Sequence, residues 1–335
     1  MTGARHGDGR RVVVTGSIAN DYIMSFPGRF SEHILPDKID ILSVSFLVDS
    51  LRREPGGTAA NIAYNLALLG LRPTVMATVG ADFEPDRRRL EARGVDTAQI
   101  RVVPDHFTAS FFVSTDEANC QIASFYIGAM GAAADLTLDT VPDDEVALVV
   151  ISPNAPEAMA KHVRECKARG LPFVYDPSQQ IVRLTAEALV EGITGSLVFI
   201  ANEYEFELVH EKTGLGVEDA LDLTGTLVVT RGEHGSIIRS GGHVHLVPAV
   251  RPTTLVDPTG VGDAYRSGIV YGLLADLPWP VAGRVGSLAA TYALEHTGTQ
   301  AHDYDAAAFL ARYEASFGDV PLALRRTLAD QAALA

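Results

Sequence analysis

The stretch ALVVISPNAPEAMAKHVRECKARGLPFVYD, residues 147–176, predicts the fold most directly. It contains a continuously apolar run, LVVI, that ends in Ser-Pro-Asn, and a second short apolar run, FVY, that ends at Asp176. Residues 156–169 between them form an amphipathic stretch of helical length. Because a strand without alternating polarity needs cover on both faces, the stretch predicts a strand–helix–strand unit of a parallel sheet buried between helices.

The same alternation of strand-like and helix-like segments recurs along the chain. Further strand-like runs lie at 12–17, 74–80, 197–202 and 226–232, and further amphipathic stretches lie at 59–69, 186–193, 259–274 and 281–295. This alternation predicts an α/β fold with a doubly wound, mostly parallel sheet and helices on both faces. Since ligands bind beyond the carboxyl ends of such strands, we expect site residues among Ser17, Asp176, Asn202 and Thr230.

Two segments interrupt this alternation of strands and helices. Residues 21–53 and 106–126 carry alternating patterns such as ILSVSFLV (41–48) and TASFFVST (108–115), with too little helix between them. They predict exposed antiparallel strands that pair into a small sheet over the main one. We therefore expect one α/β domain over residues 11–335 with a β-sheet lid inserted in it, and a flexible tail over residues 1–10.

Composition limits the class of partner. The 335 residues include 42 Asp and Glu against 27 Lys and Arg, a net charge of −15. This charge disfavours binding to nucleic acid or to an anionic membrane, so we expect neither partner. The two cysteines exclude a disulfide framework and multi-cysteine zinc motifs. With no hydrophobic region of a signal peptide and no run long enough to span a membrane, a cytoplasmic location is expected.

The strongest motif is DPTGVGDAYRSG, residues 257–268. Gly260 and Gly262 open an apolar helix, so free N–H groups and the positive end of the helix dipole converge there, which predicts an anion hole. Asp263 within this turn is either a helix cap or a base beside a reacting phosphate. The motif lacks the Gly-Lys-Ser/Thr ending of a Walker A loop. Arg266 can face either a phosphate or a carboxylate.

A second glycine motif is GGTAAN, residues 56–61. It places a flexible glycine pair before a helix and then Asn61, whose amide can reach a ligand over the closely approaching backbone at Gly57. Alone it would indicate only loop and helix packing. Together, the two motifs resemble the two signatures of the PfkB/ribokinase family, kinases that phosphorylate hydroxymethyl groups of sugars and nucleosides. The resemblance extends from about Val12 to Gln300 and implies a ribokinase-like fold.

The resemblance also implies roles for individual residues. Asp263 would be the base, and Gly260, Val261, Gly262 and Asp263 would form the anion hole. GSIAND (16–21), NEYE (202–205) and TRGEHG (230–235) resemble further family elements. They put Ser17, Asp21, Gly57 and Asn61 at the acceptor substrate and Asn202, Thr230, Gly232 and Gly235 at ATP. Glu205 would lie in the outer shell of Mg²⁺, and Asp257, Thr259 and Gly298 would surround a monovalent cation such as K⁺.

Within the family, FPGRFSEHILP (26–36), SVSFLVDSL (43–51), ASFYIGAM (123–130) and DPSQQ (176–180) are similar to adenosine kinases of actinobacteria. This similarity implies ATP-dependent phosphorylation of the 5′-hydroxyl of adenosine, with Ser45, Phe111 and Phe125 also at the substrate. A purine offers an apolar face to aromatic side chains, although Phe46, Phe111 and Phe125 can instead form lid core or a dimer seam. Because exposed sheet edges must pair or be covered, we expect a homodimer joined through the lids.

The pattern departs from the family's usual signatures at Pro258, at Val261 and in GADFEPD (80–86), which lacks a final glycine. Two alternatives stay open: a sugar kinase of the same family acting on ribose, fructose or a related sugar, and a non-catalytic nucleoside-binding relative.

Overall fold

A nine-stranded sheet forms the centre of the structure, a computed structural model that describes residues 10–332. The strand order is β13-β12-β11-β10-β9-β8-β1-β4-β5. Strands β1, β4, β5, β8, β9, β10 and β11 pair in parallel, whereas β12 and β13 add an antiparallel edge. The strands are β1 (Arg11–Thr15), β4 (Thr74–Val79), β5 (Ile100–Val102), β8 (Val146–Ile151), β9 (Phe173–Tyr175), β10 (Val198–Asn202), β11 (Thr226–Thr230), β12 (Ser236–Ser240) and β13 (His243–Val247).

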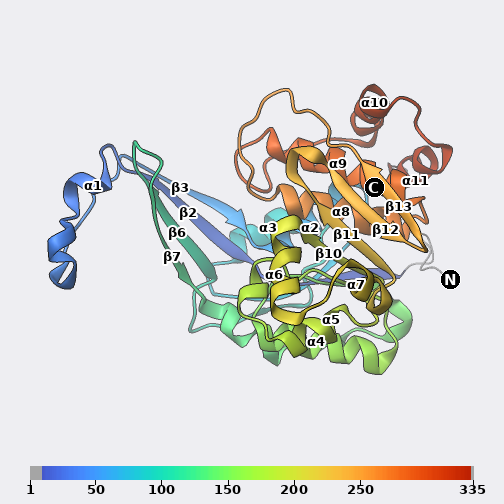
Figure 1. Cartoon of the computed structure of the whole chain (residues 1–335), viewed down its shortest axis with the longest axis horizontal. Helices are drawn as coiled ribbons and strands as arrows, with labels where there is room; N and C mark the ends of the chain where they lie inside the picture. The colour runs from blue at the N-terminus through green and yellow to red at the C-terminus, as the bar shows by residue number, and fades with distance from the viewer. Residues whose placement is uncertain (1–9, 333–335) are drawn as a thin grey trace.

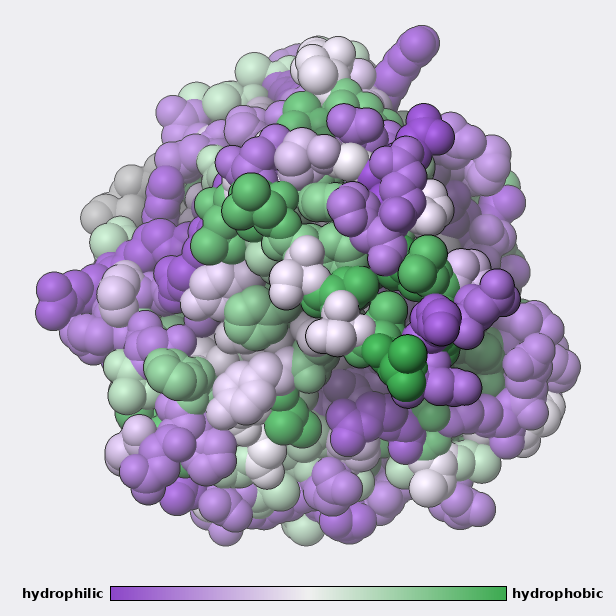
Figure 2. Space-filling view, turned by 90° about the vertical axis from the view of Figure 1, so that its left-hand side faces the viewer, coloured by the Kyte–Doolittle hydropathy of each residue, from purple (hydrophilic) through white to green (hydrophobic). Residues whose placement is uncertain are grey.

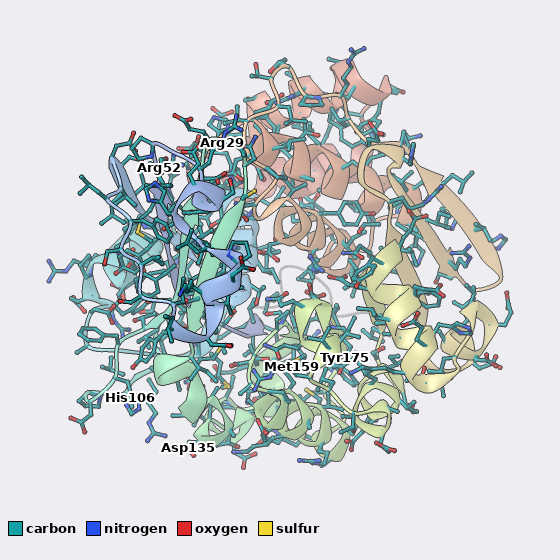
Figure 3. All side chains as sticks on the ribbon, turned by 60° about the vertical axis from the view of Figure 1, so that its left-hand side comes forward. Arg29, Arg52, His106, Asp135, Met159 and Tyr175 are labelled. Atoms are coloured by element: carbon teal, nitrogen blue, oxygen red, sulfur yellow. The ribbon has the colours of Figure 1, made fainter. Side chains whose placement is uncertain are left out.

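Helices cover both faces of this sheet (Figure 1). One core layer packs against α2 (Thr58–Leu68), α3 (Glu84–Ala92), α8 (Val261–Leu274), α9 (Trp279–Leu294), α10 (Ala306–Phe317) and α11 (Leu322–Ala332). The other packs against α4 (Pro156–Arg169), α5 (Ala186–Ile193), α6 (Glu203–Thr213) and α7 (Val217–Leu223). Met159 and Tyr175, labelled in Figure 3, are buried together in this second layer. The predicted α/β class and mostly parallel sheet are confirmed.

The strand–helix–strand unit of residues 147–176 forms as the sequence predicts. Helix α4 has Pro156 in its first turn, where the missing N–H costs nothing. It ends at Gly170, whose left-handed conformation (φ 65°) allows the N–H of Leu171 to bond the carbonyl of Cys166 at 2.9 Å. Pro156 and Gly170 thus bound the helix that connects the parallel strands β8 and β9.

A separate four-stranded sheet, the small sheet, projects from this body (Figure 1). Its order is β3-β2-β6-β7, with strands β2 (Ala19–Ser25), β3 (Ser50–Gly56), β6 (Ala109–Thr115) and β7 (Gln121–Tyr126). The predicted small lid sheet is thus present, and TASFFVST supplies β6. The central pair, β2 with β6, is parallel rather than antiparallel, because the chain crosses the body through α2, β4, α3 and β5 between them.

One strand prediction in this sheet is wrong. The alternating segment ILSVSFLV (41–48) forms no strand: a 3₁₀ helix, η1, covers Pro36–Ile41, and residues 42–48 are irregular. Helix α1 (Phe30–His33) lies at the same end of the sheet. Phe46 packs there against Phe26 and Phe30, with ring centroids 5.1 and 4.8 Å apart. The side chain of Phe46 packs at this outer end of the small sheet, which we call the tip. The alternating pattern of residues 41–48 therefore does not mark one face of a sheet.

The flexible tail expected over residues 1–10 lies, except for residue 10, outside the described residues. Among residues 10–332, no helix combines the length and apolarity needed to cross a membrane.

Candidate active site

A cavity of about 570 Å³ opens where the small sheet meets the body. Many residues that the sequence assigned to substrate, catalysis or a monovalent cation line it: Ser17, Asp21, Gly57, Asn61, Phe111, Phe125, Thr259, Gly260, Gly262 and Asp263. They come from the loop after β1, from β2, β6 and β7, and from the starts of α2 and α8, so segments between residues 17 and 263 meet in one place. The structure therefore brings together the two glycine motifs and the aromatic pair.

The amino end of α8 forms one wall of the cavity. The helix begins at Val261, after Gly260 in the left-handed conformation (φ 76°). A Cβ at Gly260 would lie 2.9 Å from Cβ of Thr299, so both the backbone angle and the close approach require glycine. The N–H groups of a first helical turn lack intrahelical acceptors, which makes this wall suitable for an anion.

Asp263 lies in this first turn and is 8% exposed. Its Oδ2 accepts a hydrogen bond of 2.8 Å from Nδ2 of Asn61, and its Oδ1 is 3.7 Å from Nη1 of Arg266. Burial raises the pKa of Asp263, while Arg266 and the Asn61 hydrogen bond oppose this rise. A carboxylate with a raised pKa and a directed donor is suited to accept a proton.

Arg266 faces carboxylates and also lines the cavity, which answers the choice that the sequence left open. Its Nε is 2.5 Å from Oδ2 of Asp176, and its Nη2 is 3.8 Å from Oε2 of Glu205. Burial alone would lower the pKa of Arg266, but Asp176, Asp263 and Glu205 raise it well above its usual value. A permanently charged guanidinium therefore lies beside the anion-binding turn.

Asp21 is the second carboxylate of the cavity. Burial, together with the negative charges of Glu54 and Asp257, raises the pKa of Asp21 to about 6. Asp257 accepts hydrogen bonds from the backbone N–H groups of Thr259, at 2.9 Å, and Gly298, at 3.1 Å. Asp257 thus joins the three residues expected to surround a monovalent cation, and its negative charge acts on Asp21.

Phe111 and Phe125 form the aromatic wall. They are directly opposite each other in the antiparallel pair of β6 and β7, and both side chains line the cavity. Ser45 and Phe46 lie instead in the segment between η1 and β3 and are not among the lining residues. Ser45 therefore does not reach this cavity within one chain, because the irregular segment that carries it is at the far end of the small sheet.

The residues expected at ATP lie at the carboxyl ends of two adjacent strands. Asn202 on β10 is the parallel partner of Thr230 on β11. The side chain of Asn202 accepts from the N–H of Glu205 at 2.7 Å, and Glu205 accepts from the N–H of Asn202 at 2.8 Å, a capping box that starts α6. Gly232 and Gly235 belong to the turn that follows β11. These residues lie outside the lining of the 570 Å³ cavity, to which Glu205 is joined through Arg266.

Several lining residues were not predicted: Ala19, Thr58, Met130, Gln179, Gln180, Arg183 and Thr299. Gln179 and Gln180 belong to DPSQQ, which follows β9, so their place at a strand's carboxyl end was the available signal. No group of three or more His, Cys, Asp or Glu residues suited to hold a metal ion occurs within the described part of the chain.

Comparison with known proteins identifies the family. Residues 11–306 match the profile of the pfkB family of carbohydrate kinases. The chain belongs to this family. It is therefore a phosphotransferase that acts on a hydroxyl group, in an ATP-using family of kinases.

Individual relatives span nearly the whole chain. A nucleoside kinase of Methanothermobacter thermautotrophicus is 28% identical over 315 residues, which cover 93% of this chain and 98% of the relative. The structure of Burkholderia thailandensis nucleoside kinase in complex with inosine is similar with a TM-score of 0.82 and 38% identity, covering 92% of this chain and 99% of that one. The nucleoside kinase of Methanocaldococcus jannaschii, described as an archaeal member of the ribokinase family, gives a TM-score of 0.82 at 25% identity and covers 92% and 100%.

Proposed function

We propose that this kinase transfers the γ-phosphoryl group of ATP to the 5′-hydroxyl of a ribonucleoside, with adenosine as the preferred acceptor. The observation that carries the proposal is the lining of one cavity by an aromatic pair, Phe111 and Phe125, and by two carboxylates, Asp21 and Asp263. Aromatic faces suit a purine, and an ionised carboxylate suits a ribose diol. The names of the nucleoside kinases from three organisms support a nucleoside as acceptor.

The positions of the residues support the following roles. Asp21 accepts hydrogen bonds from ribose hydroxyls, and Asp263 accepts the proton of the attacking 5′-hydroxyl. The N–H groups from Gly260 to Asp263 stabilise charge on the transferring phosphoryl group, and Arg266 adds a positive charge beside them. Catalysis is thus mainly positioning and electrostatics, since phosphoryl transfer passes through a loose transition state.

The cation roles are part of the same proposal. Both oxygens of Glu205 already accept hydrogen bonds, from Ser178 and from the N–H of Asn202, so Glu205 suits contact with Mg²⁺ through water. Mg²⁺ bound to the ATP phosphates supplies charge neutralisation. Asp257 with Thr259 and Gly298 offers oxygen atoms for K⁺.

A homodimer joined through the small sheets is also proposed. Large apolar side chains are exposed at the tip, including Leu35 at 61%, Ile41 at 74% and Leu47 at 86%. Figure 2 shows hydrophobic atoms gathered near the middle of the face on the small-sheet side. A patch of this kind favours burial against a second copy. Leu47→Glu should convert the dimer to a monomer in sedimentation; a monomeric wild-type protein would refute the dimer.

The acceptor is tested by measuring kcat/KM with ATP for adenosine, inosine, cytidine, ribose and fructose. Adenosine should give the highest value, and a higher value for ribose or fructose would establish the sugar-kinase alternative. Asp263→Asn should lower kcat by about 10²- to 10⁴-fold, the usual contribution of a general base. Asp222→Asn, at an exposed position of α7, is the control. A loss below about tenfold for Asp263→Asn would contradict its role as base.

A further inference from the structure

A chain of hydrogen bonds leads from Asp263 into the protein, away from the cavity. Asn61 donates to Asp263 at 2.8 Å, Nε2 of Gln300 donates to Oδ1 of Asn61 at 2.8 Å, and Nη2 of Arg89 donates to Oε1 of Gln300 at 3.0 Å. The three members nearest the cavity are buried: Asn61 is 4% exposed, Gln300 6% and Asp263 8%. The chain thus joins α8 and α2 to α3 through the segment that follows α9.

The two ends of this chain determine how its two amides are oriented. A guanidinium can only donate hydrogen bonds, and an ionised carboxylate can only accept them. Arg89 therefore requires the oxygen of Gln300 to face it, which turns the NH₂ of Gln300 toward Asn61. Asn61 must then present its oxygen to Gln300 and its NH₂ to Asp263. Reversing either amide would oppose two donors or two acceptors in a buried place, where an unmade hydrogen bond costs about 1–3 kcal/mol.

Thr299 does not determine this orientation by itself. Its hydroxyl oxygen is 2.7 Å from Oδ1 of Asn61 and also 2.8 Å from the carbonyl oxygen of Pro55. A hydroxyl group has one proton and can donate to one of these acceptors at a time. Gln300 is therefore the donor that determines the orientation of the Asn61 amide.

Arg89 is in turn held in place by Asp86 on the same helix. Nη2 of Arg89 is 3.5 Å from Oδ1 of Asp86, and the other carboxylate oxygen of Asp86 pairs with Arg53 on β3. The guanidinium that orients the amides is thus tied to a strand of the small sheet.

We propose that Arg89 and Gln300 are positioning residues, which act through Asn61 to keep a hydrogen-bond donor on Asp263 and to hold this carboxylate ionised for catalysis. The inference rests on the proposed function, because it concerns the base of that reaction. Asp263 also faces Arg266 from its own helix, Glu205 from α6 and Asp176 at the end of β9, and these groups stay unchanged in the variants below.

The test compares Arg89→Met, Gln300→Met and the double variant, with kcat measured against pH. Each single variant should lower kcat about tenfold, because small misplacements of a reacting group cost up to about 10²-fold. The acidic midpoint of the profile should rise by about one pH unit, since a carboxylate that loses a donor is more easily protonated. The double variant should show no further loss, because both changes break the same chain. Arg89→Lys keeps a charged donor and should restore most of kcat.

Arg88→Met is the matched control, because Arg88 precedes Arg89 on α3, is 76% exposed and pairs with Glu84 of the same helix. It should leave kcat and the midpoint unchanged. The inference would be overturned if the losses of kcat multiplied in the double variant, or if the acidic midpoint of Gln300→Met stayed at the wild-type pH. If Arg89→Met fails to fold, the midpoint of Gln300→Met alone decides the test. If the wild-type enzyme phosphorylates a sugar instead of a nucleoside, the proposed function fails, and the same variants measured with that sugar still test the inference.

Discussion

Asp21 and Glu54 are directly opposite each other in the antiparallel pair of β2 and β3. Like charges at such positions repel, and Asp21, which lines the cavity, is partly shielded from water. This repulsion opposes pairing of the two strands and, together with burial and Asp257, raises the pKa of Asp21 to about 6. The raised pKa of Asp21 makes both substrate binding and stability depend on pH.

The KM for the nucleoside should rise as the pH falls below about 6, because the pKa of Asp21 is about 6 and a protonated carboxyl accepts fewer hydroxyl protons. The free energy of unfolding should increase over the same fall in pH, although substrate binding weakens. The pKa of Asp21 in the folded protein exceeds its usual 3.8, so the folded state binds more protons and the free energy of unfolding gains as the pH falls from about 6 toward 4. KM measured between about pH 5 and 8, with urea unfolding at the same pH values, tests both.

Glu54→Gln is the partner experiment. Removing the negative charge opposite Asp21 should move the midpoint of the KM profile to lower pH, without abolishing turnover. A midpoint that stays in place would show that Glu54 does not influence Asp21.

Phe125→Ala should raise the KM for adenosine about tenfold and leave the KM for ATP unchanged, because stacking of a base on an aromatic side chain contributes ~1–3 kcal/mol. Phe125 is 54% exposed, so its truncation should cost little stability. Phe112→Ala is the control: Phe112 lies on β6, the strand that pairs with β7 and its Phe125, but it stacks on Tyr22 with centroids 4.8 Å apart instead of lining the cavity. An equal effect of both changes on KM would mean that Phe125 acts only through the sheet.

Arg266→Met should lower the free energy of unfolding by about 3–5 kcal/mol, because Asp176 is 1% exposed and would lose its charged partner. Asp176→Asn in the same protein should recover part of this loss. Arg231→Met, which removes an exposed ion pair with Glu203, should cost less than about 1 kcal/mol. Urea unfolding measures all three, and a small effect of Arg266→Met would indicate that water reaches Asp176.

Gly57→Ala should destabilise the protein by more than about 2 kcal/mol and impair activity. Gly57 has φ 91°, and an added Cβ would lie 2.5 Å from Cα of Ile18. Gly170→Ala is the matched control, since Gly170 also has a positive φ, 65°, but has nothing within 4 Å of the added Cβ. It should cost only about 1 kcal/mol, the backbone penalty alone. Equal losses would show that close packing at Gly57 is unimportant.

Much of the body could be predicted because its signals are local. The runs at 147–153 and 172–176 became β8 and β9, and Pro156 and Gly170 bound α4 as their chemistry requires. The same is true of the two glycine motifs, which start α2 and α8. Strands buried between two helical layers need apolar side chains on both faces, and this requirement appears in the sequence as continuous apolar runs.

The segment 41–48 shows where local pattern fails. Its alternation is equally compatible with a strand and with an irregular segment whose side chains pack on neighbours, and contacts of Phe46 with Phe26 and Phe30 determine the outcome. Ser45, which the similarity to adenosine kinases puts at the substrate, lies in this irregular segment and is not among the residues that line the cavity.

By itself, the sequence determined the alternating α/β architecture and the glycine turns, and it singled out Asp21, Asn61 and Asp263, which line the cavity. Only the tertiary structure decided their partners: Glu54 opposite Asp21, Asp176 against Arg266, and Gln300 and Arg89 behind Asn61. The physical reason is separation along the chain. Periodicity and turn chemistry reflect neighbours within a few residues, whereas the pKa and orientation of a buried group depend on charges and donors that only the folded topology brings within hydrogen-bonding distance.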